Sequence, residues 1–199
     1  MKKILSLVCV LCLFLAFLPH TAAARTYDPI IKVGLNYDSK ALPAANLQNY
    51  SGMDTGYAFG YFDEDRELVS TYEIDDENKI TVLKNTNLWL SGTDYSDTPL
   101  ANYSDTVGAY CLQIDEYFDL DDALDVIDEV EDEGYDAYLC YTAKGFRVRI
   151  GQYMSGEDAN AALERVSNNI GWELERRVPN GTCYTVVVTG TSHILYQFD

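Results

Sequence analysis

Basic residues, histidine and cysteine are all scarce in this sequence of 199 residues. The 14 lysines and arginines face 32 acidic residues, so the formal net charge is −18 at pH 7. A charge of this sign opposes binding to nucleic acid or to an anionic membrane surface, because both carry negative charge themselves. The composition therefore excludes nucleic acid as an expected partner.

Histidine and cysteine are too few for the common catalytic and metal sites. His193 is the only histidine after residue 24, which excludes most catalytic triads. Cys111, Cys140 and Cys183 follow no zinc spacing, and their odd number permits at most one internal disulfide. We expect them to be small, half-buried hydrophobic residues. The sequence predicts no metal and no cofactor.

The first 24 residues have the pattern of a signal peptide. A basic start precedes an apolar run over residues 4–18, and three alanines at 22–24 offer a cleavage site. The apolar run is shorter than the ~20 residues that a membrane-spanning helix needs. We therefore expect a secreted protein with no membrane span after cleavage; a retained membrane anchor is the alternative.

Residues 25–84 are predicted to form a small antiparallel β unit, because short apolar runs alternate with acidic turns. The expected strands cover residues 30–35, 57–62, 68–74 and 79–83. Residues 85–109 are rich in Asn, Thr, Ser, Asp and Gly, a composition typical of connections. A loop of this length inside one compact domain is unusual, so we interpret 85–109 as a linker.

The pattern changes at residue 110. Strands are expected at 110–114, 135–141, 146–150 and 172–178. Apolar residues at helical spacing predict one helix from residue 120, with Asp119 or Asp121 as its cap, and Ser155 caps a second. This order, βαββαβ, is that of the ferredoxin-like fold in the α+β class. We call residues 110–178 the module.

Eleven acids and no base lie between residues 115 and 133. The run lacks the glycine and the ligand spacing of a calcium loop, and its helical stripe favours a solvated helix face.

Two arginines stand out in the stretch GFRVRIGQY. If Val148 and Ile150 face the helices, strand alternation places Arg147 and Arg149 on the opposite, open face of the sheet, with Gln113 beside them. Such an Arg-Val-Arg pattern is often only a solvated face. The alternative interpretation is that the two arginines belong to a binding surface.

After the module, the turn signal at 179–181 and two apolar runs predict a hairpin over residues 179–199. We expect this hairpin to rejoin the β unit of residues 25–84, which makes the module an insertion.

The stretch GFRVRIGQYMSGEDANAALERV resembles a SPOR domain, a bacterial module named for sporulation proteins. The family's aromatic-Arg-Val-Arg-Val-Gly strand corresponds to residues 146–151. Its Val-Gln-Leu-Gly-Ser-Phe segment corresponds to residues 112–117, where Asp115 and Glu116 replace the glycine and serine.

The flanks IIKVGLNY and TVVVTGTSHILYQFD resemble the amino-terminal part of SpoIID/LytB-like proteins, in which a SPOR module often interrupts a β region. The lytic transglycosylase domain of that family carries its catalytic acid in a Pro-x-Glu-Met context, which this chain lacks. The resemblance therefore implies a protein without enzymatic activity.

The resemblance implies noncatalytic binding of peptidoglycan glycan strands denuded of their stem peptides. This places the protein at the cell wall or at a division or sporulation septum, with other cell-wall or septal proteins as further candidate partners. The glycan-binding residues carried over are Gln113, Tyr117, Tyr138, Arg147, Arg149 and Tyr153. The alternatives are a shortened lytic transglycosylase and a cell-surface protein-interaction module.

Overall fold

The structure is a computed structural model and describes residues 41–50 and 56–199. The expected signal peptide and the expected strand at 30–35 lie outside the described residues. No helix within the described ranges is long and apolar enough to cross a membrane.

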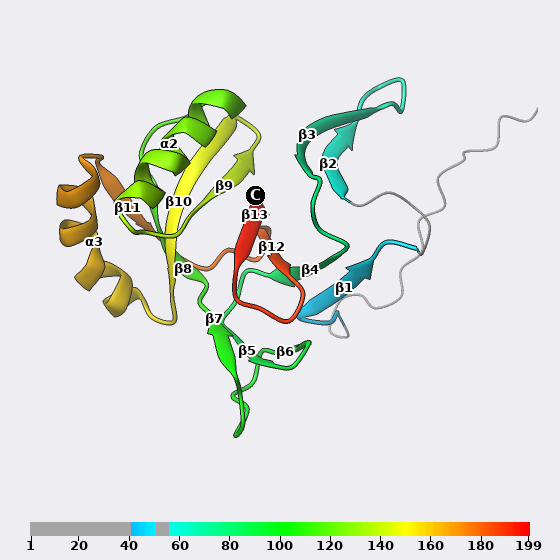
Figure 1. The fold of residues 1–199 in the computed structure, drawn as a ribbon, viewed down its shortest axis with the longest axis horizontal. Coiled ribbons are helices and arrows are strands. Elements are labelled where there is room, and N and C mark those ends of the chain that lie inside the picture. Colours follow the sequence, from blue (N-terminus) through cyan, green and yellow to red (C-terminus); the bar gives the residue numbers. More distant parts are fainter. Residues whose placement is uncertain (1–40, 51–55) are drawn as a thin grey trace, which may run out of the picture. The chain divides into compact units, whose positions relative to one another are not determined.

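The chain order of the described elements begins with strands and then alternates strands with two helices (Figure 1). The elements are β1 Ala44–Gln48, β2 Tyr57–Phe62, β3 Leu68–Ile74, β4 Lys79–Lys84, β5 Leu88–Ser91, β6 Asp94–Ser96, β7 Asp105–Val107, β8 Tyr110–Ile114, α2 Leu120–Asp132, β9 Ala137–Thr142, β10 Gly145–Tyr153, α3 Gly156–Ile170, β11 Leu174–Arg177, β12 Tyr184–Val188 and β13 Ile194–Phe198.

Eight of these strands form one sheet, in the order β1-β4-β12-β13-β9-β10-β8-β11. Neighbouring strands are antiparallel except β13 and β9, which are parallel. Within the module the spatial order is therefore β9-β10-β8-β11. Two helices and a large sheet agree with the α+β class that the sequence predicts.

The two helices begin where the sequence predicts. The side chain of Asp119 accepts a hydrogen bond from the backbone N–H of Asp122, and Ser155 does the same for Asp158. Each cap satisfies a backbone donor that would otherwise lack a partner at a helix start. Gly171 ends α3 in the left-handed conformation, with φ 76°, which costs glycine less than any other residue.

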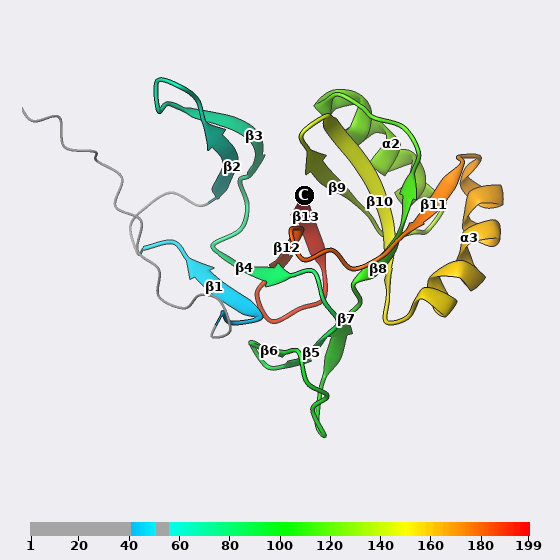
Figure 2. The same cartoon turned by 180° about the vertical axis from the view of Figure 1, so that it is seen from behind.

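Both helices pack on the same face of the sheet (Figures 1 and 2). The first core forms there, because the alternating apolar residues of β8, β9 and β10 point toward the helices. Leu112, Leu139, Val148 and Ile150 are among its fully buried members. Residues of β12 and β13, including Val186 and Tyr196, extend this core beyond the module.

A second core covers part of the opposite face. Its buried members are Leu83, Leu88, Leu90, Tyr95, Val107, Cys111, Tyr138, Val187 and Ile194. Four of them come from residues 85–109, which form a small sheet in the order β6-β5-β7. The linker expectation is therefore wrong. Turn residues dominate the composition there, but the short apolar alternation of Leu88 and Leu90 is enough to pack three strands.

The carboxyl-terminal strands link distant parts of the chain. β12 pairs with β4, and β13 pairs with β9 at the edge of the module. The expected hairpin is present, since β12 and β13 also pair with each other. The β2–β3 hairpin forms a separate sheet, and its Tyr72 ring stacks on Tyr196 with 4.9 Å between ring centroids.

The second core gives a stability prediction. Leu90 is 1% exposed, so Leu90→Ala should lower the free energy of unfolding by about 2–5 kcal/mol, because it removes buried apolar contacts and leaves a cavity. Leu68 is 50% exposed and serves as the control, with an expected change below about 1 kcal/mol for Leu68→Ala. Urea unfolding measures both. Equal effects would contradict the packing of residues 85–109 on the sheet.

Candidate functional site

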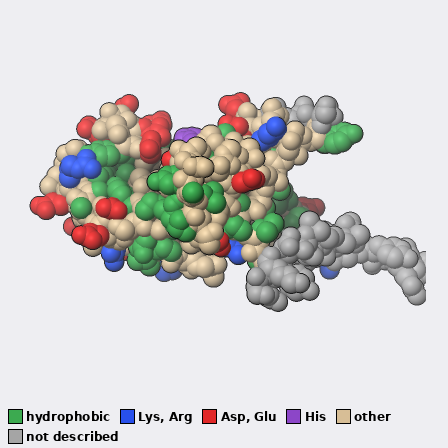
Figure 3. Space-filling model, turned by 90° about the horizontal axis from the view of Figure 1, so that it is seen from below, with side chains coloured by type: hydrophobic (Ala, Val, Ile, Leu, Met, Phe, Trp, Pro, Cys, Tyr) green, Lys and Arg blue, Asp and Glu red, His purple; other side chains and the backbone are tan. Residues whose placement is uncertain are grey.

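A pocket of about 230 Å³ lies on the side of the sheet opposite the helices. It is lined by Gln113, Tyr117, Thr142, Ala143, Lys144, Arg147, Arg149, Arg177 and Asp199. Four of these nine residues are cationic and one is acidic, in a chain of net charge −18. We call it the cationic pocket. By contrast, acidic side chains are spread over the molecular face drawn in Figure 3.

Arg147 fixes the segment that follows β8. Its Nη1 donates to the carbonyl oxygens of Ile114 (3.1 Å) and Glu116 (3.2 Å) and lies 3.4 Å from Oδ1 of Asp115. Its guanidinium also lies over the ring of Tyr117, 3.5 Å from the ring centroid. A hydrogen bond with Arg147 lowers the pKa of the Tyr117 hydroxyl. Arg147 therefore positions the exposed aromatic wall of the pocket.

Arg149 is the centre of a buried polar network. Its Nε donates to Oε1 of Gln113 (3.0 Å), and its Nη1 donates to Oε1 of Gln197 (2.6 Å). Nη1 also lies 3.4 Å from the Sγ of Cys183, and Nη2 lies 3.7 Å from Oδ2 of Asp199. The side chain thus joins β8, β10 and β13.

The structure corrects the expected open face. Arg149 is 3% exposed, Gln113 2% and Arg147 9%, so these side chains form the floor of the pocket and are not a freely exposed surface. Strand alternation placed them on the correct face. Sequence reasoning did not anticipate that β13 would lie beside β9 and supply Gln197 to the same network.

The three cysteines are fully buried, whereas the sequence predicted half-buried positions. A hydrogen bond between Cys140 and Cys183 lowers the pKa of the Cys183 thiol, and the charge of Arg149 acts in the same direction. The same hydrogen bond raises the pKa of Cys140. Cys183 therefore contributes negative charge next to Arg149 more readily than an ordinary thiol does.

Asp199 is held in the pocket by fixed partners. Its Oδ1 accepts hydrogen bonds from Nδ2 of Asn180 (2.8 Å) and Oγ1 of Thr182 (3.2 Å). Its backbone N–H donates to the carbonyl oxygen of Tyr141. The carboxylate of Asp199 thus balances part of the charge of Arg149. Arg147 and Arg177 have other acidic neighbours, Asp115 and Glu175.

Arg177 lines the pocket with a partly exposed side chain. Its Nε is buried and has no hydrogen-bond partner among the described residues, while its Nη1 lies 3.5 Å from Oε1 of Glu175. The glycan-binding residues predicted from the sequence do not include Arg177, Lys144 or Asp199. The sequence does hold a signal for Arg177: if Leu174 faces the helices, alternation along the strand places Arg177 on the opposite face, with Gln113.

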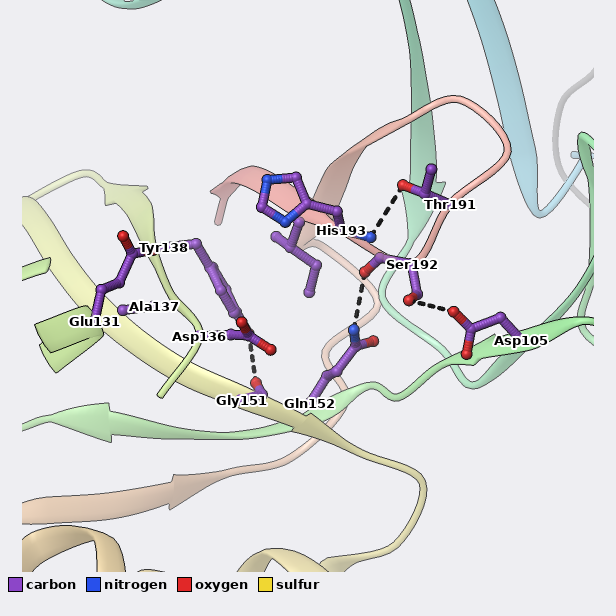
Figure 4. A pocket seen from close by; sticks show the side chains of 11 residues that line it. Asp105, Glu131, Asp136, Ala137, Tyr138, Gly151, Gln152, Thr191, Ser192 and His193 are labelled. Carbon is purple, nitrogen blue, oxygen red and sulfur yellow. Dashed lines mark hydrogen bonds between the residues drawn. The ribbon is translucent and has the colours of Figure 1, made fainter. Parts of the chain in front are cut away.

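Two predicted residues lie outside the cationic pocket. Tyr138 lines a separate pocket of about 240 Å³, where its hydroxyl donates to the carbonyl oxygen of Gly151 (Figure 4). Carboxylates of Asp105, Glu131 and Asp136 surround that pocket, so we call it the acidic pocket. Tyr153 is displaced by the irregularity between Ile150 and Tyr153, which turns its side chain to the first core.

Residues 106–171 match the family model described as the SPOR domain. SPOR domains are noncatalytic peptidoglycan-binding modules, and Gln113, Tyr117, Arg147 and Arg149 lie within the matched residues. Arg177 and Asp199, which complete the cationic pocket, follow them in the chain. Neither a curated protein nor a solved structure matches the chain significantly.

The network of Arg149 gives a second stability prediction. Arg149→Met leaves Gln113, Gln197 and Asp199 without their buried cation, so we expect a loss of about 3–5 kcal/mol in the free energy of unfolding. Arg177→Met at the half-exposed side of the same pocket should cost less than about 1 kcal/mol. Chemical denaturation compares the two variants. A similar small loss for both would show that Arg149 does not hold the strands together.

Proposed function

We propose that the cationic pocket binds peptidoglycan glycan strands from which the stem peptides have been removed. The observation that carries this proposal is the concentration of Lys144, Arg147, Arg149 and Arg177 in one pocket of a strongly acidic chain. In a peptide-bearing strand the lactyl carboxyl group is an amide. Removal of the peptide frees a carboxylate, which cations can bind.

The individual side chains suit this ligand in different ways. Lys144 and Arg177 reach the pocket from the turn before β10 and from β11, and both side chains are at least partly exposed, so their charged ends can meet a ligand oxygen. The exposed ring of Tyr117 offers a stacking surface for a sugar. Arg147 and Arg149 are committed to internal contacts, so they contribute charge and position more than direct hydrogen bonds.

The proposed role is targeting, without catalysis, of the protein to the cell wall or septum. We also propose that the module is a ferredoxin-like SPOR unit inserted into a β unit, as in SpoIID/LytB-like proteins. The β9-β10-β8-β11 order and the pairing of β4 with β12 on either side of the insertion support this organisation.

Cosedimentation with purified sacculi tests the proposed ligand. Binding should increase after an amidase removes the stem peptides, and Lys144→Ala/Arg177→Ala should weaken it about tenfold by removing two ligand-facing cations. Lys79→Ala removes an exposed cation outside the pocket and is the matched control. Failure to bind either preparation would overturn the proposal and favour a protein-interaction module.

Asp199 should limit the affinity of the pocket for an anion. Asp199→Asn keeps an acceptor for Asn180 and Thr182 but removes the negative charge, so binding to denuded sacculi should strengthen about threefold. Asp125→Asn, at an exposed position on α2, controls for the change in net charge. Weaker binding by Asp199→Asn would instead assign Asp199 to the positioning of Arg149.

A further inference from the structure

A third pocket adjoins the cationic pocket and has the opposite charge. Its volume is about 320 Å³, and it is lined by Ile114, Asp115, Glu116, Gly171, Trp172 and Glu173. One tryptophan and three acidic residues therefore line one cavity, and no cation is among its lining residues. We call it the tryptophan pocket.

The two pockets share one segment of chain as their common wall. Ile114, Asp115 and Glu116 line the tryptophan pocket, while Gln113 and Tyr117, on either side of them, line the cationic pocket. Arg147 contacts this segment through the carbonyl oxygens of Ile114 and Glu116. One arginine thus fixes the boundary between the two cavities.

Trp172 is held in place before any ligand arrives. Its ring meets Phe118 edge to face, with 5.9 Å between centroids and 79° between ring planes. Its carbonyl oxygen accepts a hydrogen bond of 2.6 Å from Oγ of Ser167. Gly171 contributes open space, since a Cβ placed there would meet no atom within 4 Å. The cavity therefore has a fixed aromatic wall, and binding to it orders few side chains.

The lining selects an uncharged ligand with several hydrogen-bond donors. Carboxylates accept strong hydrogen bonds from hydroxyl and amide groups, and an indole packs against the apolar face of a sugar ring. The negative charges of Glu116 and Glu173 repel a carboxylate, while that of Asp115 is paired with Arg147. A sugar that carries an acid group is therefore excluded from this cavity and is favoured in its neighbour.

We propose that the tryptophan pocket is a second carbohydrate subsite, which takes an uncharged N-acetylated sugar while the cationic pocket takes its carboxylate-bearing neighbour. This inference rests on the proposed function, because a denuded glycan strand alternates these two kinds of sugar. Two adjoining pockets of opposite charge would then set the register of the strand, since a shift by one sugar places a carboxylate among carboxylates.

Tryptophan fluorescence tests the subsite directly. The chain contains two tryptophans, so Trp89→Phe leaves Trp172 as the sole reporter. Titration with the uncharged trimer of N-acetylglucosamine should change the emission of Trp172 and protect it from acrylamide quenching. Glu116→Gln/Glu173→Gln should weaken this response about fivefold, because neutral amides are poorer acceptors than carboxylates. Glu129→Gln, at an exposed position on α2 outside the pocket, is the control.

The outcomes separate this inference from the proposed function. Binding of denuded sacculi without any response of Trp172 to the neutral trimer would overturn the subsite and leave the cationic pocket intact as a proposal. A saturable Trp172 response that Glu116→Gln/Glu173→Gln weakens would support the subsite even if sacculus binding failed. A response that is equal in the double variant and the control would also overturn it.

Discussion

The buried guanidinium of Arg149 is the interaction on which much of this structure depends. A charge removed from water is tolerated only when hydrogen bonds and opposite charge surround it. That environment is provided by Gln113 in β8, Gln197 in β13, Cys183 just before β12 and Asp199 just after β13. The residues that match the SPOR model contain Arg149 but not three of these four partners. The module and the carboxyl-terminal strands are therefore one structural unit around this side chain.

The same network explains how a strongly acidic protein keeps a cationic pocket. Backbone carbonyls and glutamine oxygens accept hydrogen bonds from Arg147 and Arg149. These bonds hold both guanidinium groups, and therefore their positive charge, at the pocket. Lys144 and Arg177 stand at its more accessible margin. Arg147 holds residues 114–116, which separate the cationic pocket from the tryptophan pocket. The two neighbouring pockets therefore differ in charge although they share this short segment.

Sequence patterns predicted the local structure well where periodicity was strong. The caps at Asp119 and Ser155 and the strand bounds of β2 and β3 agree with the structure, because each depends on neighbouring residues. The β5–β7 sheet was missed, since its strands are too short to stand out from the turns around them.

The site was predictable only in part, because some of its residues come together through contacts between distant parts of the chain. Alternation along single strands brought Gln113, Arg147 and Arg149 together, and they do line one pocket. The irregularity after Ile150 moved Tyr153 to the other face, and no alternating pattern reveals such a shift. Asp199 joins the pocket through the parallel pairing of β13 with β9, a contact between distant parts of the chain.

The pairing of β4 with β12 has a consequence for folding kinetics. These neighbours in the sheet are separated in the chain by the β5–β7 sheet and the whole module, so their contact closes a long loop. Loop closure costs conformational entropy, and such non-local pairings slow folding. Local hairpins such as β9–β10 and β12–β13 can form early. We therefore expect the docking of β12 and β13 between β4 and β9 to be the slow step, and this docking also removes Arg149 from water.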